Sequence, residues 1–301
     1  MAQSLFQRAR PPHRVNLKGV NARSSAVDLA RTSVRCMLVI SLFVAQQLFV
    51  RSSNAAKLAG QDVPAGGKCE IRVPISKYYQ DYAAEGGNPR PSTGRALLMF
   101  PSGFNPSRSW PILIVTSTSD NDRTSPMDVP WYEDAAIKEG WIVLATDATI
   151  RPRADSTAWR FAILAAALQT IRHDWPQSAQ WPIALAGFSG GAKITGELGA
   201  MLAKSGPIRI CGFLLIGINS DRLSAAYKDF RPAPGFLSTP VWISSGASDR
   251  VAPPASEELV YYSLKRTGFQ QVRLEQFSDG HAVKSTEVQR ALHWFRDVGK
   301  F

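Results

Sequence analysis

The sequence predicts an α/β fold with a mainly parallel eight-stranded sheet that is flanked by helices on both faces. From Cys69 onward, short apolar runs alternate with amphipathic stretches, which is the pattern of strands joined by crossover helices. Central runs such as 112–115 and 183–186 are apolar at every position, as parallel strands covered on both faces must be. The chain has 301 residues, of which 45% are hydrophobic, so it can bury one large core.

The expected elements follow one another along the chain. Strands are predicted at 69–75, 95–100, 111–116, 141–146, 182–187, 208–217, 240–245 and 271–277. Helices are predicted at 129–139, 157–173, 192–204, 254–267 and 285–298. Segment 76–94, rich in Tyr, Gly and Pro, is too broken for a crossover helix, so the first two strands are expected to pair antiparallel. Ligands in open sheets of this kind bind at the carboxyl ends of the strands, and the chemistry is expected there.

The N-terminal 55 residues are predicted to be a basic arm followed by a signal peptide. Residues 1–51 hold eight basic residues and one acidic residue. The apolar run 36–50 contains two glutamines and is shorter than the roughly 20 residues of a membrane-spanning helix. Small residues follow it, so the pattern predicts secretion or export to the periplasm, with cleavage near Ala55. An uncleaved membrane anchor is the alternative.

The remainder is predicted to comprise a linker at 56–67 and a single domain at 68–301. Most of the formal net charge of +11 belongs to the arm, so the charge does not predict nucleic-acid binding by the folded part. No membrane contact is expected after cleavage. Cys69 and Cys211 would remain, and they could pair in an oxidising compartment. Cys211, however, lies within an apolar strand, where a cysteine usually acts as a small hydrophobic residue.

One motif predicts nucleophilic chemistry. Residues 187–191, GFSGG, fit the pattern G-x-S-x-G between a predicted strand and a predicted helix. A sharp strand-to-helix turn exposes the serine, and the flanking glycines relieve the crowding. Ser189 is therefore the predicted nucleophile. A phosphate-binding loop would require Gly before Lys193 and Ser or Thr after it, but the sequence has Ala192 and Ile194.

A serine nucleophile needs a general base that is oriented by a third group. His281 follows the last predicted strand, in a loop at the carboxyl edge, and is the predicted base; the other three histidines lie in the arm or in helical stretches. Asp249 comes directly after the strand 240–245 and is the predicted orienting acid. Asp221, which follows the preceding strand, is the alternative acid.

The order Ser, Asp, His along the chain resembles that of the α/β-hydrolase superfamily from about Arg95 to Phe301. The segments RALLMFPSGFNPSRSWPILIV and GFSGG also resemble secreted feruloyl esterases and polyhydroxyalkanoate-depolymerase-like esterases. The resemblance implies an α/β-hydrolase fold and hydrolysis of a small-molecule or polymeric ester through an acyl-enzyme, with no cofactor and no metal. A peptidase or amidase using the same triad, and a non-catalytic binding protein with this fold, stay open.

The departure from those esterases falls at the turn after the third predicted strand. They carry His-Gly there, whereas this sequence has Thr-Ser-Thr-Ser at 116–119. Because oxyanion stabilisation uses backbone N–H groups, Gly190 and either Thr118 or Ser117 are the predicted donors. Aromatic residues near the same edge are predicted to contact substrate, with ordinary packing as the alternative: Phe188, Trp131, Tyr227, Phe230 and Phe236.

Overall fold

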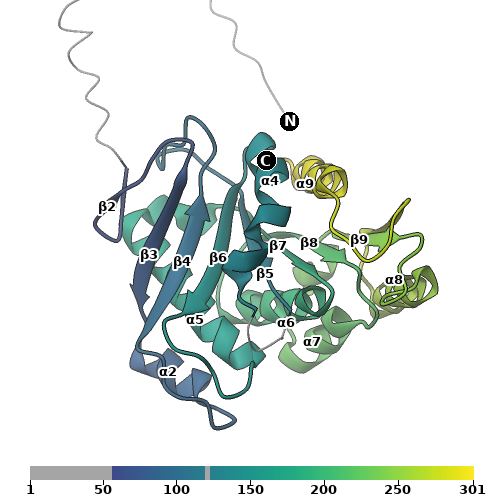
Figure 1. The fold of residues 1–301 in the computed structure, drawn as a ribbon, viewed down its shortest axis with the longest axis horizontal. Coiled ribbons are helices and arrows are strands. Elements are labelled where there is room, and N and C mark those ends of the chain that lie inside the picture. Colours follow the sequence, from purple (N-terminus) through teal and green to yellow (C-terminus); the bar gives the residue numbers. More distant parts are fainter. Residues whose placement is uncertain (1–55, 119–122) are drawn as a thin grey trace, which may run out of the picture. The chain divides into compact units, whose positions relative to one another are not determined.

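The computed structural model describes residues 56–118 and 123–301. The predicted basic arm and signal peptide lie outside the described residues. The main sheet has eight strands in the order β10-β9-β8-β7-β5-β6-β4-β3, which Figure 1 shows from β3 at the left to β9 at the right. Its strands are β3 (Lys68–Pro74), β4 (Thr93–Met99), β5 (Ile112–Thr116), β6 (Ile142–Ala148), β7 (Ile183–Phe188), β8 (Ile210–Ile216), β9 (Val241–Gly246) and β10 (Val272–Phe277).

The sheet is parallel from β6 through β5, β7, β8 and β9 to β10. Strand β4 runs antiparallel to both of its neighbours, β3 and β6. Each predicted strand overlaps one of these eight, and the predicted antiparallel pair at the start of the sheet is confirmed. The fold class predicted from the alternating pattern is therefore confirmed as well.

Helices cover the sheet on both sides. The predicted ones correspond to α4 (Glu133–Lys138), α5 (Thr157–Asp174), α6 (Gly190–Ser205), α8 (Pro254–Thr267) and α9 (Ser285–Gly299). Three further helices were not predicted: α2 (Lys77–Ala83), α3 (Ser125–Asp128) and α7 (Arg222–Phe230). The first residue of α7 follows Asp221, whose Oδ1 accepts a hydrogen bond of 2.8 Å from the Ser224 N–H and so satisfies a free donor of the first turn.

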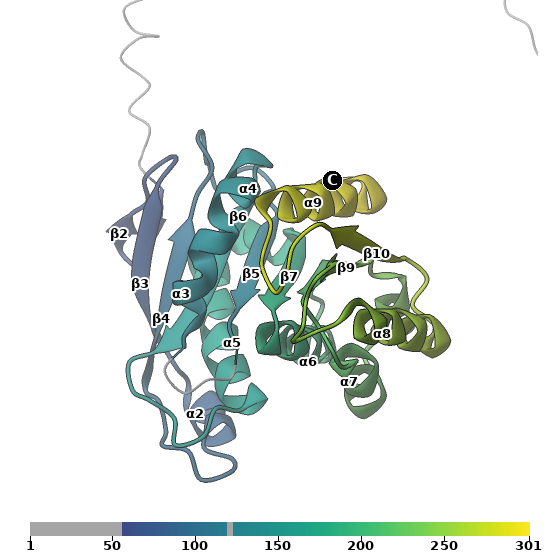
Figure 2. The same cartoon turned by 45° about the vertical axis from the view of Figure 1, so that its right-hand side comes forward.

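Alternate residues of each central strand belong to two separate cores. Leu113 and Val115 of β5 pack with α4 and α9, whereas Ile112 and Ile114 pack with α5 and α6. Figure 2 shows α4 and α9 next to each other over one face, with α5 and α6 over the other. Period-two alternation with both faces apolar explains why these strands are hydrophobic at every position. The two layers of helices leave the carboxyl edge of the sheet to the loops.

The segment predicted to be a linker is folded. Strands β1 (Lys57–Leu58) and β2 (Gln61–Asp62) form a short antiparallel ribbon, and Leu58 is fully buried in the core. The two turn residues, Ala59 and Gly60, both have positive φ, as tight hairpin turns require. The prediction of a linker is wrong here because a single buried leucine among small polar residues carries no periodic signal.

The two cysteines of the described chain are separate thiols. Cys69 packs in the core on the α5 side of the sheet and Cys211 in the core on the α9 side, and both are buried and unpaired. Burial raises the pKa of each thiol. The alternative in which they form a disulfide is contradicted. In residues 56–118 and 123–301, no helix is both long and apolar enough to cross a membrane.

Candidate active site

Ser189 occupies a sharp turn between β7 and α6. Its backbone has φ 57° and ψ −118°, a conformation that costs a non-glycine residue free energy and is found mostly where the surrounding structure imposes it. The Ser189 N–H donates a hydrogen bond of 2.8 Å to the carbonyl of Ile216, at the end of β8. The turn therefore presents a half-buried serine at the N-terminus of α6.

The two glycines of the motif allow the turn to pack closely against β5. A Cβ on Gly187 would lie 2.3 Å from the backbone of Gly191, and a Cβ on Gly191 would lie 2.4 Å from the carbonyl oxygen of Thr116. Neither position has room for a side chain. The Thr116 hydroxyl reinforces the contact because it hydrogen-bonds the Gly191 carbonyl at 2.8 Å and the Thr195 hydroxyl at 2.6 Å.

His281 and Asp249 meet across the loops that follow β10 and β9. The His281 Nδ1 atom lies 2.6 Å from the Asp249 Oδ2 atom. The other carboxylate oxygen, Oδ1, accepts hydrogen bonds of 2.7 and 2.8 Å from the N–H groups of Val251 and Ala252. Burial raises the pKa of Asp249, but these N–H groups and His281 together hold it below its ordinary value. Asp249 is thus a buried, fully partnered carboxylate.

The imidazole of His281 lies beside the turn that carries Ser189. Its ring centroid is 4.4 Å from that of Phe188. The neighbouring Gly217, which follows the strand that binds the Ser189 N–H, leaves room for both rings, since a Cβ there would lie 2.9 Å from His281 and 3.0 Å from Phe188. Within the described residues, Ser189 and His281 are not joined by a hydrogen bond. Such bonds are often long in unliganded active sites and shorten when substrate binds.

The other aspartates near this edge have different partners. Asp221 caps α7 through Oδ1, and Asp279 binds the Gly280 N–H and Lys284 on the surface. His281 contacts Asp249, and neither Asp221 nor Asp279 takes part in that contact.

The predicted oxyanion donors have unequal surroundings. Gly190 is the first residue of α6, and the N–H groups of a first turn have no partner within their own helix. The Ser117 N–H is buried and already donates to the Ser125 hydroxyl at 3.3 Å. Thr118, the next residue, is half-buried. Of the two alternatives after β5, the Ser117 N–H is thus already engaged within the fold.

The five predicted substrate-binding aromatic residues fall into two groups. Phe188 contacts both His281 and Trp131, whose ring centroid lies 5.5 Å away. Phe236, in contrast, is buried against Phe213 and Phe269, and Tyr227 stacks on it at 6.2 Å. Phe230 packs against the same core. The structure therefore favours the packing alternative for Tyr227, Phe230 and Phe236, because α7 and the turn that follows it place these side chains against the hydrophobic core.

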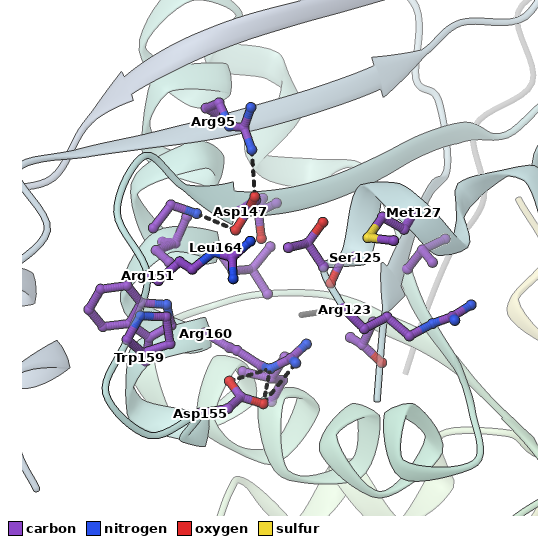
Figure 3. Close-up of a pocket in the computed structure, with 18 of the residues that line it drawn as sticks. Arg95, Arg123, Ser125, Met127, Asp147, Arg151, Asp155, Trp159, Arg160 and Leu164 are labelled. Atoms are coloured by element: carbon purple, nitrogen blue, oxygen red, sulfur yellow. Dashed lines mark hydrogen bonds and ion pairs between the residues drawn. The ribbon is translucent and has the colours of Figure 1, made fainter. Parts of the chain in front are cut away.

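A pocket with a volume of about 320 Å³ opens beside the residues that follow β5. Figure 3 shows paired charges around it, with Arg160 facing Asp155 and Arg95 facing Asp147. Thr116 contributes to its wall, whereas Ser189 and His281 do not line it.

Sequence reasoning missed a second buried carboxyl group behind the site. Glu257, in the first turn of α8, is fully buried. Burial, together with the negative charge of Asp249, raises its pKa to about 7, although Ser245 and the N–H groups of Ile218 and Gly217 act in the opposite direction. The signal available in the sequence was weak, because a glutamate near a helix N-terminus is ordinarily a surface residue.

Because of this glutamate, we expect the free energy of unfolding to depend on pH. Its ordinary pKa is 4.5, so between pH 4.5 and 7 the folded state binds the proton more tightly than the unfolded chain. The contribution of protonated Glu257 to the free energy of unfolding is fully present below pH 4.5 and is lost as the pH rises through 7. Glu257→Gln, which cannot ionise, should escape that loss, so its free energy of unfolding should rise relative to wild type by on the order of 2 to 3 kcal/mol between pH 5 and pH 8. Urea unfolding at both pH values measures this. Parallel pH dependences of the two proteins would contradict it.

No group of three or more metal-ligating side chains occurs in the part of the chain that the structure describes. The groups assembled at this edge are a strained serine, a histidine bound to a buried carboxylate, and backbone N–H groups at a helix start. Together these can perform acyl transfer by nucleophilic attack.

The fold is the α/β-hydrolase fold. No protein-family model and no curated protein sequence matches the chain. Solved structures of esterases do match. One of two esterases from the fungus Rhizomucor miehei has a TM-score of 0.55 and 16% identity, with 78% of this chain and 85% of that one covered. The carboxylesterase EstE1, from a metagenomic library, has a TM-score of 0.54 and 13% identity, with 79% and 91% covered.

An esterase from Pyrobaculum calidifontis is similar to the same extent, with a TM-score of 0.53, 14% identity, and 78% of this chain and 86% of that one covered. At such identities the likeness establishes the fold, and function must be argued from the site. The finer resemblance to feruloyl esterases and polyhydroxyalkanoate depolymerases stays a prediction.

Proposed function

We propose that this protein is a serine hydrolase that cleaves carboxylic esters. The Ser189 hydroxyl oxygen attacks the ester carbonyl while His281 takes the hydroxyl proton. The alcohol then leaves with that proton, which His281 returns to it. Water, activated by the same histidine, then releases the acid from the acyl-enzyme. Asp249 holds the imidazole in the tautomer with the proton on Nδ1 and stabilises the imidazolium that forms. The Gly190 and Thr118 N–H groups are the proposed donors to the oxyanion.

The observation that carries this proposal is the contact of 2.6 Å between His281 and the buried Asp249, beside the strained turn at Ser189. The lowered pKa of Asp249 supports it, because an ionised carboxylate stabilises a protonated imidazole. The solved structures that share this fold are named as esterases, which supports the choice of esters over amides in this proposal. Phe188, which lies against His281, and Trp131, which contacts Phe188, are the proposed aromatic surface for substrate.

A substrate panel tests the proposal. The purified protein is assayed against p-nitrophenyl esters of increasing acyl length, hydroxycinnamoyl esters and short polyhydroxyalkanoates, and in parallel against aminoacyl and peptidyl p-nitroanilides. We expect turnover of esters and little or none of the anilides. Preference for the anilides would favour a peptidase or amidase, and inactivity throughout would favour a binding protein. The hydroxycinnamoyl and polyester arms also test the finer resemblance.

We also propose that the protein is exported, on the basis of the basic arm, the apolar run and the small residues after it. Expression of the full chain in a bacterium should give a processed protein whose N-terminus lies between Ser52 and Lys57. Intact mass and N-terminal sequencing measure this directly. Recovery of the whole chain in the membrane fraction would instead support an uncleaved anchor.

A further inference from the structure

The turn after β5 is held by a charged side chain from outside the predicted catalytic residues. Arg160, in the first turn of α5, is only 13% exposed. Its Nη1 donates to the Ser117 carbonyl at 3.2 Å and to the Ser117 hydroxyl at 3.0 Å, and its Nη2 donates to the Thr118 carbonyl at 2.6 Å. One guanidinium thus bridges two consecutive carbonyl groups.

The guanidinium is itself fixed in place. Asp155, just before α5, accepts from Arg160 Nε at 2.8 and 2.9 Å and lies 2.8 Å from Nη2. Forked contacts of this kind fix orientation as well as charge. Figure 3 shows this pair at one side of the pocket. The carboxylate of Asp155 also offsets the positive charge of Arg160. The pair therefore does not provide a free cation that could bind an anionic substrate.

The bonds to the two carbonyls set the direction of the peptide groups. In a trans peptide the C=O and the following N–H point in opposite directions. A guanidinium bound to the Ser117 carbonyl therefore directs the Thr118 N–H away from Arg160. The same peptide lies against the first turn of α6, since a Cβ on Gly191 would be 3.0 Å from the Ser117 carbonyl carbon and 3.1 Å from its oxygen.

We propose that Arg160 is a positioning residue for the oxyanion hole: by holding the Ser117 and Thr118 carbonyls, it aims the Thr118 N–H toward the carbonyl oxygen attacked by Ser189. This role rests on the proposed esterase function.

Kinetics of Arg160→Met and Arg160→Lys test the role. A lysine keeps the charge, but its ammonium is a single point that cannot hold two carbonyls in the geometry of the fork. Both variants should lower kcat by about 10 to 10² with KM changed less than threefold, since loss of a whole oxyanion donor costs about 10² to 10³. Affinity for a trifluoromethyl ketone, which forms a tetrahedral oxyanion on Ser189, should fall by a similar factor.

Arg95→Met is the matched control, because Arg95 lines the same pocket and pairs with Asp147 without contacting the turn. It should keep wild-type kcat and inhibitor affinity. Thermal unfolding identifies a variant that is not folded; if Arg160→Met fails this criterion, Arg160→Lys decides. Unchanged kcat in a folded Arg160 variant, or a raised KM at constant kcat, would overturn the positioning role. An inactive wild-type protein would overturn the proposed function and this role with it.

Discussion

Replacing Ser189 with alanine should abolish ester turnover and labelling by a fluorophosphonate probe. The hydroxyl is the proposed nucleophile, and loss of such a residue in serine hydrolases costs on the order of 10⁴ to 10⁶ in rate. Thermal unfolding should change little, because the Ser189 hydroxyl makes no hydrogen bond among the described residues and alanine keeps the same Cβ in the strained turn. Steady-state kinetics, gel-based labelling and a melting curve measure the three quantities.

The informative control for this variant is Ser117→Ala. Ser117 is another buried serine near the site, and its hydroxyl contacts Arg160 rather than His281. It should keep the probe-reactive nucleophile. A Ser189→Ala protein that retained a tenth of the wild-type rate would show that the nucleophile has been assigned to the wrong residue.

Asp249→Asn should lower kcat by roughly 10⁴ with little change in KM. The structure supplies the reason. Oδ1 is bound to the N–H groups of Val251 and Ala252, so an asparagine would keep its oxygen there and turn its amide nitrogen toward His281. Nδ1 of the imidazole would then have to accept a hydrogen bond, which moves its proton to Nε2. The histidine could no longer take the proton from Ser189. Steady-state kinetics on a p-nitrophenyl ester measure the loss.

Asp221→Asn provides the contrast. Asparagine is as good a helix N-cap as aspartate, so the bond to the Ser224 N–H and the start of α7 should survive. Activity should stay within about a factor of ten of wild type, because an aspartate outside the triad acts on the site only through screened electrostatics. A crippled Asp221→Asn protein beside a nearly normal Asp249→Asn protein would transfer the role of the acid to Asp221.

The fold was largely predictable because its signal is periodic. Each central strand must be apolar on both faces, and each crossover helix must present an apolar stripe, so strands such as 183–186 stand out. Helix α7 has no comparable signal, since it spans only nine residues and begins at a capping aspartate. Without that helix, the packing of Tyr227, Phe230 and Phe236 against the core could not be distinguished from a substrate contact in the sequence.

Site residues were predictable where a residue type that the chemistry needs also directly follows a predicted strand. Ser189 could be found because a strained turn needs glycines at fixed positions. Asp249 could be ranked above Asp221 because it directly follows its strand, and the structure places it against His281. Arg160 was not found. Its signal was an arginine within the apolar stretch 158–168, but only the structure identifies the carbonyls that it binds.

The central claim is that Ser189 is an activated nucleophile. Incubation of the folded wild-type protein with a fluorophosphonate, followed by intact mass and peptide mapping, tests it most directly. We expect one adduct per chain, located on Ser189, and no adduct under the same conditions in the Asp249→Asn variant. An adduct on another residue, or none in a protein that melts cooperatively, would contradict it.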